Sequence, residues 1–116
     1  MKVFNKEETL STARRVIDIE SRAVAALADR LDDSFSAAVE MILAATGKVV
    51  VSGMGKSGII CQKIASTLAS TGTSSFFLHP AEGVHGDLGM LMKNDILMAI
   101  SNSGETEEII KIVPLV

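Results

Sequence analysis

Three short, mostly apolar runs constrain the fold of this 116-residue chain more than any other feature. They cover residues 49–51, 75–78 and 95–100, and a polar segment with small residues follows each of them. Such runs are typical of strands that are buried on both faces, as in a parallel sheet. A helical pattern follows the first run, and another begins at Glu107 after the third. This order predicts βαβ units and therefore an α/β fold.

Two helices are predicted before the first strand. Over residues 6–31, apolar side chains recur at intervals of three and four, which is the period of an amphipathic helix. Asp32, Asp33 and Ser34 offer an N-cap for a second helix, which we expect Gly47 to end as a C′ glycine. The stripes consist of Leu10, Ala13, Ile17, Val24, Leu27 and Leu31 in the first helix and of Phe35, Val39, Ile42, Leu43 and Thr46 in the second.

The helix after the first strand is expected to run to about Ser70, with Gly72 ending it. Cys61 falls on the apolar stripe of this helix, so we interpret it as a small core residue rather than a nucleophile. It is the only cysteine, which excludes an internal disulfide and indicates a reducing compartment. The stripe consists of Ile60, Cys61, Ile64, Ala65, Leu68 and Ala69.

Charge and composition exclude several classes of protein. The chain has 11 basic and 14 acidic residues, a net charge of −3 and no Trp or Tyr, which argues against nucleic-acid binding. No apolar run approaches the roughly 20 residues that a membrane-spanning helix needs. Residues 1–10 lack the apolar centre of a signal peptide. We therefore expect a cytoplasmic protein without a nucleic-acid or membrane partner.

Polar loops follow each predicted strand, at residues 52–58, 79–87 and 101–106. They hold six of the nine glycines of the chain, five serine and threonine residues, and both histidines. Ligands of an open parallel sheet bind outside the carboxyl ends of the strands. We therefore expect the functional site where these loops meet.

In the first loop, Gly53, Gly55 and Gly58 have the G-x-G-x-x-G spacing of a dinucleotide site. The acidic residue that such a site needs about 20 positions later is absent, and Lys56 lies where a pyrophosphate needs bare backbone. The loop suits one phosphate better, because glycine N–H groups, the helix dipole and the Ser57 hydroxyl all favour an anion. A tight turn with a solvated lysine is the alternative.

The loop over residues 101–106 offers a second group of donors, at the end of a strand and ahead of a helix. Such a nest of donors suits the three oxygens of a phosphate. The alternative is an ordinary serine-rich turn with Thr106 as the N-cap of the next helix, and the two are compatible. Two such loops on neighbouring strands predict a monophosphate site. The short polar side chains around Gly104 are those of Ser101, Asn102, Ser103 and Thr106.

These segments resemble the sugar isomerase (SIS) domain family. Residues 101–106, SNSGET, are similar to the phosphate loop of the family. Residues 53–58 (GMGKSG), 69–73 (ASTGT) and 79–90 (HPAEGVHGDLGM) are together similar to its arabinose-5-phosphate isomerase branch. The resemblance covers the chain from about residue 5 to residue 116, and it implies a three-layer, flavodoxin-like fold with N-terminal helices.

The resemblance implies interconversion of D-ribulose 5-phosphate and D-arabinose 5-phosphate, which leads to Kdo for lipopolysaccharide or capsule and needs no cofactor. A carboxylate or histidine suits the proton transfers, and a lysine can stabilise the developing oxyanion. His85 also matches a ligand of an inhibitory zinc ion in some members, and Glu108 equally fits a solvated glutamate of a first helical turn. The implied phosphate-binding residues are Gly55, Ser57, Ser101, Asn102, Ser103 and Thr106, and the implied catalytic residues are Lys56, Glu82, His85 and Glu108.

We expect the chain to be the N-terminal portion of a single SIS domain, with a helical lead-in over residues 1–47 and βαβ units over residues 48–116. Family members continue through a further catalytic glutamate and histidine and usually a pair of CBS domains. The chain is therefore expected to be a fragment, or to be completed by a partner subunit.

Two functional hypotheses follow. The first is an isomerase that acts on a sugar phosphate as a homo-oligomer, either a dimer or a tetramer. The second is a sugar-phosphate-binding module without catalytic activity. A phosphohexulose isomerase is disfavoured by the sequence of residues 79–90.

Overall fold

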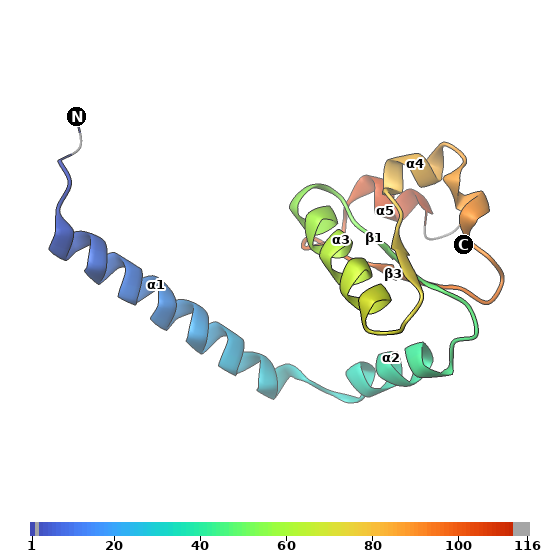
Figure 1. Cartoon of the computed structure of the whole chain (residues 1–116), viewed down its shortest axis with the longest axis horizontal. Helices are drawn as coiled ribbons and strands as arrows, with labels where there is room; N and C mark the ends of the chain where they lie inside the picture. Colours follow the sequence, from blue (N-terminus) through green and yellow to red (C-terminus); the bar gives the residue numbers. More distant parts are fainter. Residues whose placement is uncertain (2, 113–116) are drawn as a thin grey trace. The chain divides into compact units, whose positions relative to one another are not determined.

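The computed structural model describes residue 1 and residues 3–112 (Figure 1). The chain divides into two compact units, Met1–Val39 and a second unit that begins at Glu40. The boundary lies within helix α2, Asp33–Ala44.

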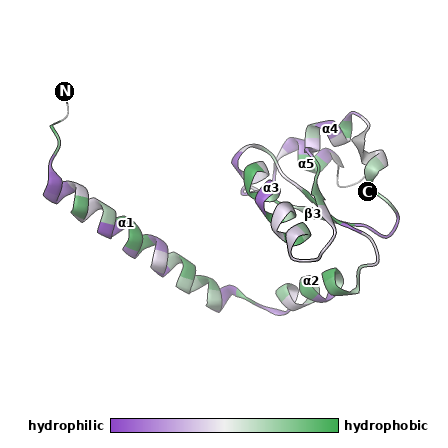
Figure 2. Ribbon diagram, viewed as in Figure 1, coloured by the Kyte–Doolittle hydropathy of each residue, from purple (hydrophilic) through white to green (hydrophobic). Residues whose placement is uncertain are grey.

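The first unit is helical, as the pattern over residues 6–31 predicts. Helix α1 spans Lys6–Ala26, and the 3-10 helix η1 continues it over Leu27–Arg30. The side chain of Asn5 begins α1 by accepting a hydrogen bond from the Glu8 N–H at 3.1 Å. Hydrophobic residues, green in Figure 2, recur along α1, yet none of its residues is buried, and Ile17 is 67% exposed. The first unit thus leaves the predicted stripe uncovered.

Helix α2 ends earlier than its sequence pattern suggests, and the prediction of Gly47 as its C′ glycine is wrong. The helix stops at Ala44, and Gly47 is not among the glycines with positive φ. A Cβ atom on Gly47 would overlap the carbonyl of Asn94 and lie 2.5 Å from Oδ1 of Asp95. Glycine is therefore needed here for a close approach between two segments and not to end a helix.

The three predicted strands form one parallel sheet, which confirms the α/β prediction. The strands are β1 (Val49–Ser52), β2 (Ser75–Phe77) and β3 (Ile96–Ala99), in the spatial order β2-β1-β3. Val50 pairs with β2 on one side and with β3 on the other. All four residues of β1 are fully buried, which is why the three valines Val49, Val50 and Val51 follow one another without polar alternation.

Helix α3, Gly55–Ser70, connects β1 to β2 and packs against both strands. Cys61 is fully buried in the core with Val49 and Val51, so its interpretation as a core residue is confirmed, and burial raises the pKa of its thiol. Ile60, which the periodicity assigned to the same face, is 56% exposed. The buried stripe of α3 is therefore narrower than predicted.

The C-terminus of α3 confirms the predicted stop at Gly72, whose φ is +104°. The Gly72 N–H donates to the carbonyl of Ala69 at 3.4 Å, and the Thr73 N–H donates to the carbonyl of Leu68 at 2.9 Å. This is the Schellman pattern, in which the first residue beyond the cap is left-handed. Glycine adopts that conformation without the strain that a Cβ atom would bring.

The segment predicted as a loop over residues 79–87 contains helix α4, Pro80–Val84, and is followed by the 3-10 helix η2, Asp87–Met90. Helix α5, Glu107–Ile112, begins where the sequence predicts it. Helices α4 and α5 lie side by side (Figure 1). Within the described part of the chain, no helix combines the length and apolarity that crossing a bilayer requires.

Asp95 is expected to make the stability of the second unit depend on pH. Its carboxylate accepts the Lys48 N–H at 2.7 Å and the Met92 N–H at 2.8 Å, which joins the segment before β1 to the segment before β3. These two hydrogen bonds, with the charge of Lys48, lower the pKa of Asp95 below its ordinary 3.8. A carboxyl with a lowered folded-state pKa stabilises the fold above its unfolded pKa, and this stabilisation is lost as the pH falls through the folded pKa.

The measurement is the urea midpoint of unfolding from about pH 6 to about pH 2.5. Below about pH 4 the midpoint should fall more steeply for the wild type than for Asp95→Asn, whose side chain does not titrate. Identical pH dependence of the two proteins would show that the Asp95 carboxylate does not stabilise the fold in this way.

Candidate functional site

The strand order places a switch point at the carboxyl end of β1, because the connection from β1 leads to β2 while β3 lies on the other side. Ligands of open parallel sheets bind at such points. The segments after β1 and β3 contact one another there. The Ile100 N–H donates to the carbonyl of Ser52 at 2.9 Å, and a Cβ atom on Gly53 would lie 3.0 Å from the Ile100 carbonyl oxygen. The first predicted loop therefore begins beside Ile100, the residue that leads into the third predicted loop.

The first of these loops is shorter than predicted, because α3 begins at Gly55. The Gly58 N–H donates to the carbonyl of Met54 at 3.1 Å, so Lys56 and Ser57 lie in the first helical turn. The preceding N–H groups of this turn have no intrahelical acceptor, and Met54 makes no side-chain cap. The turn thus presents backbone donors at the positive end of the helix dipole, a setting that favours an anion.

The positive charge of Lys56 is unfavourable for the stability of α3, because the residue lies at the N-terminus of this helix. Its side chain is exposed in the first turn of α3, where the dipole disfavours a cation, and this turn holds no acidic residue. Among the described residues, no ion pair includes Lys56. The lysine adds positive potential at a place that already favours anions, which is useful for binding a phosphate and not for stabilising the helix.

Two of the three glycines in the first loop allow α3 to lie close to the sheet. A Cβ atom on Gly58 would lie 2.6 Å from the Gly53 carbonyl oxygen, and one on Gly53 would lie 2.8 Å from Sγ of Cys61. The third glycine, Gly55, has a φ of +57° and open space around it. Packing thus explains part of the G-x-G-x-x-G spacing without a dinucleotide.

The serine-rich loop is shaped by its own hydroxyl groups. Oγ of Ser101 lies 2.6 Å from Oγ1 of Thr106 and accepts the Gly104 N–H at 3.0 Å. Oγ of Ser103 accepts the Glu105 N–H at 3.1 Å, and Gly104 turns the chain with a φ of +72°. The Thr106 hydroxyl therefore bonds across the loop. Of the side chains implied in phosphate binding here, Asn102 and Ser103 are exposed, and Ser101 and Thr106 are half-buried.

The side chains implied in acid–base chemistry lie on two helices that contact each other. Glu82 is exposed on α4, and His85 follows that helix, also exposed. Glu108 is half-buried in the first turn of α5. On α5 the neighbouring Glu107 pairs with Lys111 at 2.7 Å, and this hydrogen bond lowers the pKa of Glu107. Glu108 is therefore not part of the ion pair between Glu107 and Lys111.

One residue of this region, His79, is not among the site residues that the sequence analysis implies. It is the N-cap of α4, and its Nδ1 accepts the Ala81 N–H at 3.2 Å. Pro80 is the sequence feature that could have indicated His79 as an N-cap, because proline is favoured at the first position of a helix.

A zinc site is not assembled by the described residues. Among the side chains of residues 1, 3–86 and 89–111, no group of three or more from His, Cys, Asp or Glu is close enough to hold a metal ion. His85 alone does not form a structural or catalytic zinc site, which needs at least three protein ligands.

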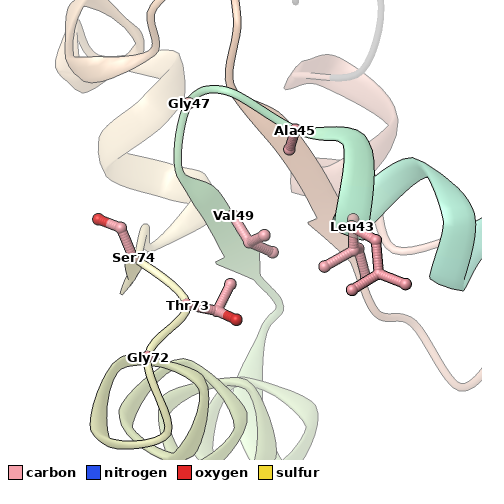
Figure 3. Close-up of a pocket in the computed structure, with 8 residues that line it drawn as sticks. Leu43, Ala45, Gly47, Val49, Gly72, Thr73 and Ser74 are labelled. Atoms are coloured by element: carbon pink, nitrogen blue, oxygen red, sulfur yellow. The ribbon is translucent and has the colours of Figure 1, made fainter.

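A cavity of about 300 Å³ lies at the amino ends of the strands, where β1 and β2 begin (Figure 3). Val49 and Gly47 line it from the β1 side, and Thr73 and Ser74 line it from the β2 side. The end of α2 contributes Leu43, which is 80% exposed. Because this cavity is at the amino ends of the strands, it is separate from the candidate site.

A comparison with protein families identifies one family. The model of the SIS domain family matches residues 42–116. The chain belongs to the SIS domain family. Its SIS-type fold, predicted from the resemblance, is therefore confirmed.

Curated proteins and solved structures provide further similarities. The chain is 51% identical to arabinose 5-phosphate isomerase KdsD of Pseudomonas aeruginosa, in an alignment that covers all of this chain and 36% of that protein. It is 50% identical to arabinose 5-phosphate isomerase GutQ of Escherichia coli K12, in an alignment that covers 93% of this chain and 34% of that protein. A structure of an Escherichia coli CFT073 protein in complex with arabinose 5-phosphate superimposes with a TM-score of 0.90 at 44% identity, covering 97% of this chain and 60% of that one. The chain spans about a third of the length of these curated relatives.

Proposed function

We propose that the protein is an isomerase that interconverts D-ribulose 5-phosphate and D-arabinose 5-phosphate. The observation that carries the proposal is the contact between Gly53 and Ile100 after β1 and β3, because an uncapped helix N-terminus with a lysine follows Gly53 and a loop rich in hydroxyl groups follows Ile100. This combination suits a single phosphate group. The names of KdsD and GutQ, and the arabinose 5-phosphate bound to the solved relative, support the pentose phosphate as substrate.

The proposed roles follow from where each side chain lies. A phosphate held at one end of the sugar orients the reacting carbons, which lowers the entropy cost of the proton transfers. Lys56 is proposed to stabilise the oxyanion of the enediolate, and Glu82, His85 and Glu108 to move protons between the two carbons and the two oxygens. The proposed phosphate-binding residues are Gly55, Ser57, Ser101, Asn102, Ser103 and Thr106.

A second candidate function is binding of a sugar phosphate without catalysis. It is favoured by the exposure of Glu82 and His85, because acid–base groups that work on a substrate are usually enclosed with it.

We also propose that the chain forms the N-terminal portion of one SIS domain, with residues 1–47 as a helical lead-in and residues 48–116 as βαβ units. The exposed stripe of α1 supports a homo-oligomer, because a long apolar face is normally covered by another surface. We place the protein in the cytoplasm, in the supply of Kdo for lipopolysaccharide or capsule.

The test is NMR spectroscopy of arabinose 5-phosphate incubated with the purified protein and a chelator. Ribulose 5-phosphate that accumulates in proportion to protein concentration would support the isomerase. A shifted phosphorus resonance without product would support the binding module. If no product forms and the phosphorus resonance does not shift, both functions are contradicted.

In the binding measurement, Ser101→Ala should weaken affinity about tenfold or more, because it removes a hydrogen bond to a charged group. Ser66→Ala, in an exposed part of α3, is the control and should bind normally.

A further inference from the structure

His79 is held at two points between β2 and α4. Its Nδ1 accepts the Ala81 N–H at 3.2 Å, and its ring meets the ring of Phe77 edge-on, with centroids 6.3 Å apart and planes at 88°. An accepting Nδ1 requires that the neutral ring carry its proton on Nε2. The side chain therefore has one defined tautomer and one defined contact surface.

The backbone on either side of His79 is anchored to the core. Leu78 is buried, and both of its backbone polar groups bond to β1, with its carbonyl accepting from Oγ of Ser52 at 2.5 Å. Pro80 is fully buried at the start of α4. The ring of Phe77 lies 3.7 Å from the position that a Cβ atom on Gly58 would take. His79 thus connects a rigid region, formed by β1 and α3, to the first turn of α4.

Helix α4 has five residues, and helices of this length are not stable without support from outside. Its hydrogen bonds run from the Gly83 N–H to the His79 carbonyl at 3.0 Å and from the His85 N–H to the Glu82 carbonyl at 3.0 Å. Helix α4 contacts α5, where Glu108 lies. The positions of Glu82, on α4, and of His85, at its C-cap, therefore depend on whether α4 is formed.

We propose that His79 is a positioning residue, whose side chain caps α4 and thereby holds Glu82 and His85 in place without touching the substrate. This inference rests on the proposed isomerase function. The competing role for His79 is direct donation of a hydrogen bond from Nε2 to the sugar. The two roles require different parts of the side chain, because capping needs only an acceptor beside the backbone, whereas direct donation needs the imidazole N–H.

Two substitutions separate these roles. His79→Asn keeps an acceptor at a position where asparagine is among the preferred N-caps, but it removes the imidazole. His79→Ala removes both the acceptor and the ring. Amide hydrogen exchange at Gly83, His85 and Gly86 should be about five-fold faster in His79→Ala than in the wild type and within about two-fold of it in His79→Asn. Nitrogen-15 NMR of the wild type should show His79 protonated on Nε2.

The same variants are compared in the isomerisation of arabinose 5-phosphate. His79→Ala should lower kcat about tenfold with little change in KM, because the proposed phosphate contacts lie elsewhere, and His79→Asn should restore kcat. A kcat in His79→Asn as low as in His79→Ala, with α4 still protected from exchange, would overturn the proposal in favour of direct donation. Unchanged exchange in His79→Ala would also overturn it.

Absence of product with the wild type would instead contradict the proposed function, and the cap would still be tested. In that case the imidazole resonances of His85 report its position. They should move in His79→Ala and stay at their wild-type shifts in His79→Asn. Unmoved His85 resonances in His79→Ala would show that the cap does not position this side chain.

Discussion

Replacing Lys56 with alanine should lower kcat for arabinose 5-phosphate isomerisation by about two to three orders of magnitude. The expected loss is large because the ammonium group lies exposed in an uncapped first helical turn, with no acidic residue in that turn to neutralise it. The charge is thus available to the enediolate, whose negative charge develops during proton transfer. The measurement is kcat by NMR of the sugar phosphates, with the affinity for arabinose 5-phosphate measured in parallel.

Lys63→Ala is the matched control, because Lys63 is exposed on the same helix but two turns further from its N-terminus. It should leave kcat and affinity unchanged. Lys56→Ala should also stabilise the protein slightly, by up to about 1 kcal/mol at low ionic strength, because it removes a cation from the positive end of a helix dipole. Full activity in Lys56→Ala would contradict the role proposed for this lysine.

Substitution of Gly58 by alanine is expected to destabilise the protein by about 1–3 kcal/mol. The added methyl group would lie 2.6 Å from the backbone carbonyl of Gly53, so α3 and the turn after β1 would have to move apart. The higher helix propensity of alanine, about 1 kcal/mol, offsets only part of this cost. Urea unfolding gives the free-energy difference. The displaced turn should also weaken the binding of arabinose 5-phosphate, since Lys56 and Ser57 belong to it.

Gly89→Ala is the comparison for this experiment. Gly89 has no atom within 4 Å of its Cβ position and no positive φ, so the substitution should change stability by less than about 0.5 kcal/mol. If Gly58→Ala proved as stable as Gly89→Ala, the close approach of α3 to the sheet would not be a constraint on this sequence.

Some elements were predictable because their cause is local. The run of valines over residues 49–51 has no polar side chain, which is compatible with burial on both faces and with little else. Gly72 follows a long helical pattern, and the left-handed φ that ends a helix favours glycine at that position. The start of α5 at Glu107 was likewise visible, because polar residues with a threonine precede two glutamates.

Other predictions failed because tertiary contacts override weak local preferences. Residues 80–84 contain a proline and a glycine and were predicted as a loop, yet they form α4 because His79 caps it and α5 packs against it. Gly47 follows a helical pattern and resembles a helix stop. Its actual constraint comes from Asn94 and Asp95, which lie almost fifty residues away in the sequence and leave no room for a Cβ atom.

By itself, the sequence determined the order of the three strands and of the helices other than α4, because hydropathy patterns are local. Only the tertiary structure decided which loops meet. Val51 pairs with Phe77 on one side and with Met98 on the other, and this order places Gly53, just before α3, beside Ile100, which leads into the serine-rich loop. Such pairing depends on residues that are distant in the sequence, and no local pattern encodes it.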